Sequence, residues 1–339
     1  MIRARILIIL ILSSLFIGCS TKNKAGNDIF DVPQNDIASA NVFWGNLFSD
    51  LCKTSNKENI CLSPLSAQYA LAMVANGAES KTKEELYKAL ASGCDVNAFY
   101  KNLLKTINTN EDWQHCEVNI ANSIWINNKL NVKEPFVTEN RESYEATIEQ
   151  VAFNDVTLQH INDWCKKMTK GKIPTILDDI KPNDRMYLIN AIYFNAIWNK
   201  KFNKENTKKE NFTTENGNVV EVDMMRQREN SLYCNNKDFE ITVKRYYDGK
   251  YSMLLALPKK EMKCDKAAQT IMSNLEHYLS EMNRCEVDLS MPKFTVEFGS
   301  SLKHVLEQQG ITRAFGEKAQ FNGISDEPLC ISDIMQKIK

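Results

Sequence analysis

Residues 59–86 read NICLSPLSAQYALAMVANGAESKTKEEL, and this stretch says most about the fold. Ser63 followed by Pro64 is typical of a helix start, because a serine hydroxyl caps the first turn and proline fits its first position. Gly77 suits the end of that helix. The stretch after Pro64 is rich in small residues, namely Ala67, Ala70, Ala72, Ala75 and Ala78. Small side chains on every side of a helix predict one that is buried tightly.

The rest of the chain predicts a mixture of strands and helices. Further helices are expected from near Asn41, after a Thr82–Glu85 capping box, at 157–171 and at 301–310. Strands are expected at 116–127, 145–153, 185–198 and 285–299, with a hairpin over 239–258 that turns at Asp248-Gly249. These elements do not alternate as regular βαβ units. The predicted fold class is therefore α+β with large mixed sheets and eight or nine helices.

The N-terminus reads MIRARILIILILSSLFIGC. Arg3 and Arg5 precede an apolar run at 6–17, which is short for a membrane-spanning helix but typical of a signal-peptide core. The sequence therefore predicts an exported protein.

The junction Gly18-Cys19 is similar to the end of a bacterial lipoprotein signal. That similarity predicts a signal peptide at 1–18, lipid on the Cys19 thiol, and a tether over 19–39 that holds the protein on a membrane at the periplasmic or cell-surface side. The alternative is an ordinary secretion signal, with Cys19 near the cleavage point by coincidence.

Composition excludes several classes of function. The 339 residues carry 42 basic and 43 acidic side chains, so charge gives no reason to expect DNA or RNA as a partner. The four histidines lie in no zinc or metalloprotease pattern, and phosphate or dinucleotide loops are absent from the sequence. We therefore expect no enzyme activity, no metal and no cofactor. Without Cys19 the cysteines number nine and contain no C-x-x-C pair, so most are expected to be small buried residues rather than disulfides.

The last residues, 326–339, read DEPLCISDIMQKIK. Ile331, Ile334, Met335 and Ile338 fall on both faces of an extended chain, which predicts a strand covered on both sides. A chain end is more often polar and unpaired. The sequence therefore ends within an element that is expected to be buried.

Six stretches together resemble the serpin family. They are 59–86, already quoted, INDWCKKMTKGKIPTIL (161–177), LINAIYFNAIWNKKFNKENTKKENF (188–212), VDMMRQ (222–227), MPKFTVEF (291–298) and LKHVLEQQGITRAFGEKAQFNGISDEPLCIS (302–332). They follow in the family's order and extend over roughly 40–339, which is expected to form a single serpin-like domain.

This resemblance implies a mechanism. Serpins offer a reactive loop to a serine or cysteine protease, and the cut loop then enters a large sheet as an extra strand. By resemblance Ser63, Ser66 and Asn190 lie in the shutter, where that sheet opens, and Trp198 lies in the breach at its top. Simpler roles remain open: Ser63 as a helix cap, Asn190 as a buried amide that needs partners, and Trp198 as core.

The sequence departs from the family in two places. Gln336 stands where the family has a shutter histidine, so this position can form hydrogen bonds but cannot change charge. The resemblance also stops before the hinge and reactive loop, so no reactive bond is present and the domain is expected to be truncated and non-inhibitory as written. The alternatives are an incomplete record of an inhibitor of secreted proteases, a serpin-derived binding or scaffold protein, and an inactive fragment.

Overall fold

The structure is a computed structural model that describes residues 7–11, 34–55, 57, 59–90, 93, 95–108, 115–247, 249–259 and 261–338. It has two compact units. Unit 1 comprises Met1–Lys53, Gln114–Cys116 and Asn195–Thr295, and unit 2 comprises Thr54–Trp113, Glu117–Phe194 and Val296–Lys339. The described residues contain nine α-helices and eleven strands, which confirms the predicted α+β class.

Unit 2 is built around strands from two separate sheets. One sheet has the order β3-β2-β4, from β2 (Cys116–Asn127), β3 (Thr147–Val151) and β4 (Met186–Ala196). The other is the antiparallel pair β10 (Phe298–Ser301) and β11 (Met335–Ile338). Within the described chain, β4 and β11 therefore each have a hydrogen-bonded neighbour on one side only.

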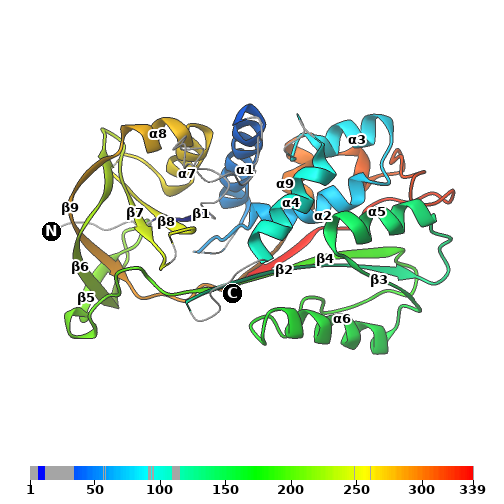
Figure 1. Cartoon of the computed structure of the whole chain (residues 1–339), viewed down its shortest axis with the longest axis horizontal. Helices are drawn as coiled ribbons and strands as arrows, with labels where there is room; N and C mark the ends of the chain where they lie inside the picture. Colours follow the sequence, from blue (N-terminus) through cyan, green and yellow to red (C-terminus); the bar gives the residue numbers. More distant parts are fainter. Residues whose placement is uncertain are drawn as a thin grey trace, which may run out of the picture. The chain divides into compact units, whose positions relative to one another are not determined.

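Helices cover both faces of the β3-β2-β4 sheet (Figure 1). One face carries α2 (Pro64–Ala75), α3 (Ser80–Tyr87), α4 (Val96–Asn108) and α5 (Glu134–Tyr144), and α6 (Asp155–Met168) lies on the other. The short helix α9 (Lys303–Gln308) also belongs to unit 2. This arrangement buries the strands on both sides, as their apolar sequences require.

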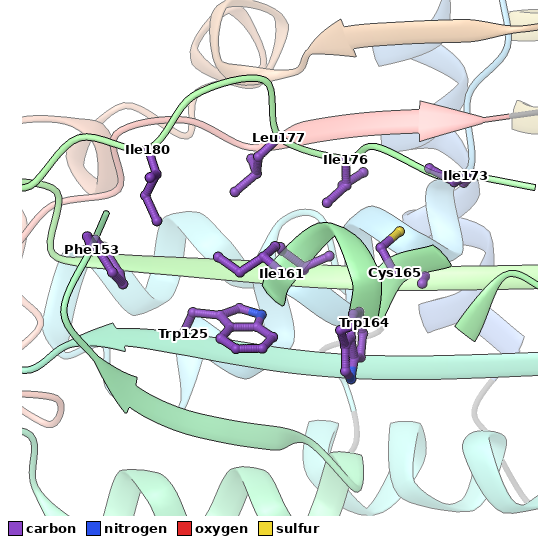
Figure 2. Packing of buried hydrophobic residues seen from close by; sticks show 11 residues of the cluster. Trp125, Phe153, Ile161, Trp164, Cys165, Ile173, Ile176, Leu177 and Ile180 are labelled. Carbon is purple, nitrogen blue, oxygen red and sulfur yellow. The ribbon is translucent and has the colours of Figure 1, made fainter. Parts of the chain in front are cut away.

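The α6 face is fixed by large interlocking side chains (Figure 2). Ile161, Trp164 and Cys165 of α6 pack in one buried cluster with Trp125 of β2. The segment that follows α6 adds four more members, which are Ile173, Ile176, Leu177 and Ile180. Asn162 holds this segment in place, because its Oδ1 accepts from the backbone N–H groups of Ile176 and Leu177 at 2.8 and 3.1 Å.

The α2 helix forms as predicted. The Ser63 Oγ accepts a hydrogen bond from the Ser66 N–H at 3.4 Å, and Pro64 occupies the first turn. The helix ends at Ala75, two residues before Gly77. Most of its side chains are buried, consistent with the run of small residues.

The capping box predicted at Thr82 and Glu85 was wrong. Helix α3 begins at Ser80, and its preceding residue makes no side-chain cap. The Thr82 Oγ1 instead accepts from the Gln320 N–H, and the Glu85 Oε2 accepts from the N–H groups of Thr312 and Arg313 at 2.7 and 2.8 Å. Both side chains are used to satisfy a distant backbone segment, which outweighs the local capping preference.

Unit 1 has one six-stranded sheet. Its order is β1-β8-β7-β6-β5, with β9 also paired to β6. The strands are β1 (Leu7–Ile11), β5 (Lys208–Thr213), β6 (Val219–Asn235), β7 (Phe239–Arg245), β8 (Ser252–Pro258) and β9 (Asn283–Pro292). The predicted hairpin is confirmed: β7 and β8 are antiparallel, and Gly249 has a φ of +70° in their turn.

Three helices complete unit 1, namely α1 (Gln34–Thr54), α7 (Cys264–Ser273) and α8 (Leu275–Glu281). Helix α1 begins seven residues before Asn41 and includes the last part of the tether expected at 19–39. A helix long and apolar enough to cross a membrane does not occur among the described residues.

The N-terminal predictions are only partly covered by the structure. Leu7–Ile11, inside the predicted signal peptide, pairs with β8 as β1. Cys19 lies outside the described residues, so its lipidation stays a prediction. Of the eight described cysteines, only Cys116 and Cys165 are buried. The expectation that most would be buried was therefore wrong, because several lie at element ends and on exposed strands.

A close backbone approach joins the end of α2 to the chain before Ser325. The Gly323 N–H donates to the Gly77 carbonyl at 3.1 Å. A Cβ added to Gly77 would lie 2.0 Å from Ile324 Cγ1 and 3.1 Å from the Ile324 backbone nitrogen. A glycine at position 77 is therefore required by the close approach of the Ile324 backbone and side chain.

We expect Gly77→Ala to lower the free energy of unfolding by roughly 1–3 kcal/mol, the usual cost of overpacking a core. Gly316→Ala is the matched control, because a Cβ there meets nothing within 4 Å and the Gly316 φ of −130° suits alanine. Urea denaturation of both variants measures the difference. Equal stability of the two variants would contradict the close approach.

Candidate functional site

A side-chain amide joins β11 to the start of α2. The Ser63 N–H donates to the Gln336 Oε1 at 2.9 Å, and the Gln336 Nε2 donates to the Ser63 carbonyl at 2.8 Å. Gln336 is 5% exposed. This two-bond contact, here called the Gln336 clamp, satisfies both backbone groups of the residue that caps α2.

A second amide chain runs from β4 to α5. The Asn190 Nδ2 donates to the Asn122 Oδ1 at 2.8 Å, and the Asn122 Nδ2 donates to the Tyr144 carbonyl at 2.8 Å. The other amide atom of Asn190, its Oδ1, is buried without a hydrogen-bond partner in the described chain. An unsatisfied buried acceptor costs free energy, so this site retains polar capacity.

The two amide systems border one small cavity, here called the β4–β11 gap. Its walls include Leu188 and Asn190 of β4 on one side and Met335 and Gln336 of β11 on the other. Ser66, Ala67 and Ala70 of α2 also line it. The cavity volume is about 10 Å³, which is room for about one water. One water there would satisfy the Asn190 oxygen.

The burial of the C-terminal segment corrects the sequence prediction. Ile331 and Ile334 are buried, but they precede the strand, which is limited to four residues. Within β11, Gln336 is buried whereas Met335 is 50% exposed. The strand therefore alternates instead of being covered on both faces, because its polar amide finds partners on Ser63 and Met335 lies at the edge of the gap.

The structure brings together four residues that the sequence analysis singled out: Ser63, Ser66, Asn190 and Gln336. Ser66 contributes its backbone N–H to the Ser63 cap and lines the gap. Asn122 was missed. The signal for it was an asparagine in the apolar strand predicted at 116–127, since a buried amide needs partners.

Trp198, the fifth such residue, lies in unit 1. Its ring stacks on Tyr246, with centroids 4.3 Å apart and planes 12° apart. The Lys244 Nζ lies 5.4 Å from the Trp198 centroid and 4.6 Å from that of Phe202. Trp198 therefore helps to enclose a buried cation, a role that the sequence analysis did not foresee.

Lys244 is 1% exposed and fully hydrogen-bonded. Its Nζ donates to the Glu229 Oε1 at 2.9 Å, the Gln227 Oε1 at 2.6 Å and the Lys200 carbonyl at 3.1 Å. Burial lowers the pKa of Lys244, and the hydrogen bond to Glu229 opposes that shift. The ammonium is thus held by its partners in a site that disfavours charge.

Groups of three or more metal-ligating side chains do not occur in the described part of the chain.

Comparison of the chain with known proteins points to one family. A family profile described as Serpin (serine protease inhibitor) matches residues 38–339. The chain is 30% identical to human Serpin I2 over 298 residues, which is 84% of this chain and 73% of that protein.

Two further relatives agree. The chain is 30% identical to alpha-1-antitrypsin of Meriones unguiculatus, over 90% of this chain and 77% of that protein. The structure of the present chain is similar to that of a thermophilic serpin, Tengpin, in the latent state. The TM-score is 0.81 and the identity 31%, over 91% of this chain and 85% of the other.

We expect the Gln336 clamp to support stability without pH dependence of its own. Gln336→Glu replaces the donor to the Ser63 carbonyl by a buried acid whose pKa burial would raise. The free energy of unfolding of this variant should therefore fall as pH rises through that raised pKa, since the folded state holds the proton longer than the unfolded state.

Gln336→Ala should lower the free energy of unfolding by about 1–3 kcal/mol at any pH, because the half-buried Ser63 N–H loses its acceptor and the Ser63 carbonyl keeps only the Ala67 N–H, at 3.3 Å. Gln308→Ala, an exposed glutamine on α9, is the matched control. Denaturation at several pH values measures all three. A Gln336→Ala variant as stable as the Gln308→Ala control would show that the clamp contributes nothing.

Lys244 and Glu229 should behave as a coupled pair. We expect Lys244→Met alone to cost about 3 kcal/mol of unfolding free energy, because it leaves the Glu229 carboxylate largely buried without its cation. Adding Glu229→Gln should restore most of that loss. A double-mutant cycle by urea denaturation measures the coupling, and additive losses would contradict the pair.

Proposed function

The chain belongs to the serpin family, and we propose that its ancestral function is inhibition of serine or cysteine endopeptidases by loop cleavage and strand insertion. We assign strand uptake to the β4–β11 gap. On this proposal the chain is not an enzyme. Its partner would be a secreted protease.

The observation that carries the proposal is the pair of open strand edges. β4 and β11 each have one hydrogen-bonded neighbour in the described chain, and both line the same gap. A strand placed between them would pair with both edges, which is the physics of β-strand addition.

Uptake requires the gap to widen, because about 10 Å³ holds no strand. Widening by movement of β11 away from the start of α2 would break the two hydrogen bonds of the Gln336 clamp. An inserted strand would gain a ladder on both sides, at about 0.5–1.5 kcal/mol for each hydrogen bond. A strand of roughly eight residues would form more hydrogen bonds than the two of the clamp, so the clamp acts as a barrier to opening and not as a permanent closure.

The small residues of α2 support the same proposal. Ser66, Ala67 and Ala70 line the gap, and they present little bulk to a strand that moves past them. Large interlocked side chains resist such movement because interiors are close-packed. Those of the α6 cluster lie on the opposite face of the sheet. Those on the α2 face, namely Tyr69, Tyr100 and Tyr144, do not line the gap.

Residues 1–339 are proposed to accept a strand without trapping a protease, because the family motifs recognised in them include no reactive bond. The second candidate function is a serpin-derived binding or scaffold protein, which would use the same gap without a bait. Export is proposed from the N-terminal pattern, with Cys19 as a lipid attachment point to a membrane.

The test is strand uptake from solution. We expect a 12-residue peptide rich in Thr, Ala and Val to raise the midpoint of thermal unfolding of residues 1–339 saturably. The same peptide with proline at alternate positions is the control, because it cannot donate to one of the two strand edges. Gln336→Ala should take up the first peptide faster, since the barrier is lower.

Incubation with serine and cysteine proteases tests the proposal that residues 1–339 do not trap a protease. We expect cleavage or no reaction, and a denaturant-resistant covalent complex would overturn the proposal that these residues do not trap. Equal effects of both peptides would overturn strand uptake at the gap.

A further inference from the structure

Unit 1 contains a cavity of about 200 Å³ where two neighbouring strands separate. β6 and β7 pair only from Tyr233↔Thr242 to Asn235↔Glu240. Beyond that point β6 stays paired with β9, and β7 stays paired with β8. The space between the diverging strands is here called the β6–β7 wedge.

The apex of the wedge is held by side-chain hydrogen bonds. The Ser231 hydroxyl of β6 donates to the Val243 carbonyl of β7, and Ser231 is buried. The Thr242 Oγ1 donates to the Leu232 carbonyl at 3.0 Å. The separation is therefore a formed feature of the sheet and not a frayed end, because the backbone groups near its apex have partners.

The wedge is rich in positive charge. Lys200, Arg245 and Arg284 line it, and Glu229 is the one acidic side chain among its described lining residues. The Glu229 carboxylate already accepts from the buried Lys244 ammonium, which lies outside the lining. The three cations at the wedge therefore exceed the negative charge that is available to them.

Two of these cations have no carboxylate partner. In the described part of the chain, neither the Arg245 nor the Arg284 guanidinium lies within ion-pair distance of an Asp or Glu. By contrast, the neighbouring Arg226 and Arg228 on β6 pair with Glu210 and Glu286 at 2.6 and 2.9 Å. A guanidinium presents a planar fork of donors that matches carboxylate, phosphate or sulfate.

We propose that the β6–β7 wedge binds a small ligand through a phosphate or sulfate group, with Arg245 and Arg284 donating to its oxygens. The cavity exceeds the size of a free oxyanion, so it can also hold part of the molecule that carries the group. Asn230 lines the wedge as well and supplies an uncharged amide donor. This site is separate from the β4–β11 gap and does not depend on the function proposed above.

The probe is inorganic phosphate, added to the full chain at constant ionic strength and followed by ³¹P line width. We expect saturable broadening that sulfate displaces and chloride does not, since chloride lacks the oxygen geometry. Glucose 6-phosphate provides a second arm: tighter binding than inorganic phosphate identifies a phosphate ester as the better ligand, and weaker binding identifies the free ion.

Arg245→Gln and Arg284→Gln should each weaken phosphate binding by about tenfold or more, as expected for loss of a charge-assisted hydrogen bond. Arg141→Gln, an exposed arginine on α5 in unit 2, is the matched control for charge and should bind as the parent does. Arg284→Lys keeps the charge without the planar fork of donors. Its affinity for phosphate should lie between that of the parent and that of Arg284→Gln. Absence of saturable binding, or equal binding by Arg245→Gln and Arg141→Gln, would overturn the site.

Discussion

Backbone hydrogen bonding at the edges of β4 and β11 is the constraint on which the rest of unit 2 depends. Each strand has a neighbour on one side only in the described chain, and exposed edges of this kind readily pair with other chains. Side-chain amides supply some of the hydrogen bonds that a further neighbouring strand would form. Gln336 bonds the Ser63 backbone, and Asn190 bonds Asn122. These few amide hydrogen bonds hold the strands, but they are fewer than the backbone hydrogen bonds that a complete inserted strand would form.

The two faces of the β3-β2-β4 sheet follow from this constraint. The α6 face packs aromatic and branched side chains around Trp125 and Trp164, which fixes that side (Figure 2). On the other side α2 presents serine and alanine to the gap. Tight packing on the α6 face, and small side chains at the gap itself, would let one strand boundary open without loss of the core. Membership of the serpin family gives this arrangement its proposed use.

Particular residues explain how far the sequence alone could predict the fold. The Ser63-Pro64 start, the alanine-rich helix and the turn at Gly249 were predictable because each depends on local backbone chemistry. Family resemblance pointed to Gln336 and Asn190, and the structure places both at one gap. The remainder depends on distant partners. Thr82 and Glu85 resemble a capping box, yet both bond a segment more than two hundred residues away. Asn122, Lys244 and the wedge arginines carry no local signal, because their roles arise only when strands meet.

Amide hydrogen exchange along β4 and β11 in the free chain tests the central claim most directly. Amides that face β2 or β10 have ladder partners, and amides that face the gap do not. We therefore expect alternate amides of β4 to exchange quickly between protected ones, and the quick ones to become protected when a strand-forming peptide is bound. Uniform protection of β4 and β11 in the free chain would contradict open edges, and so would unchanged exchange after the peptide binds.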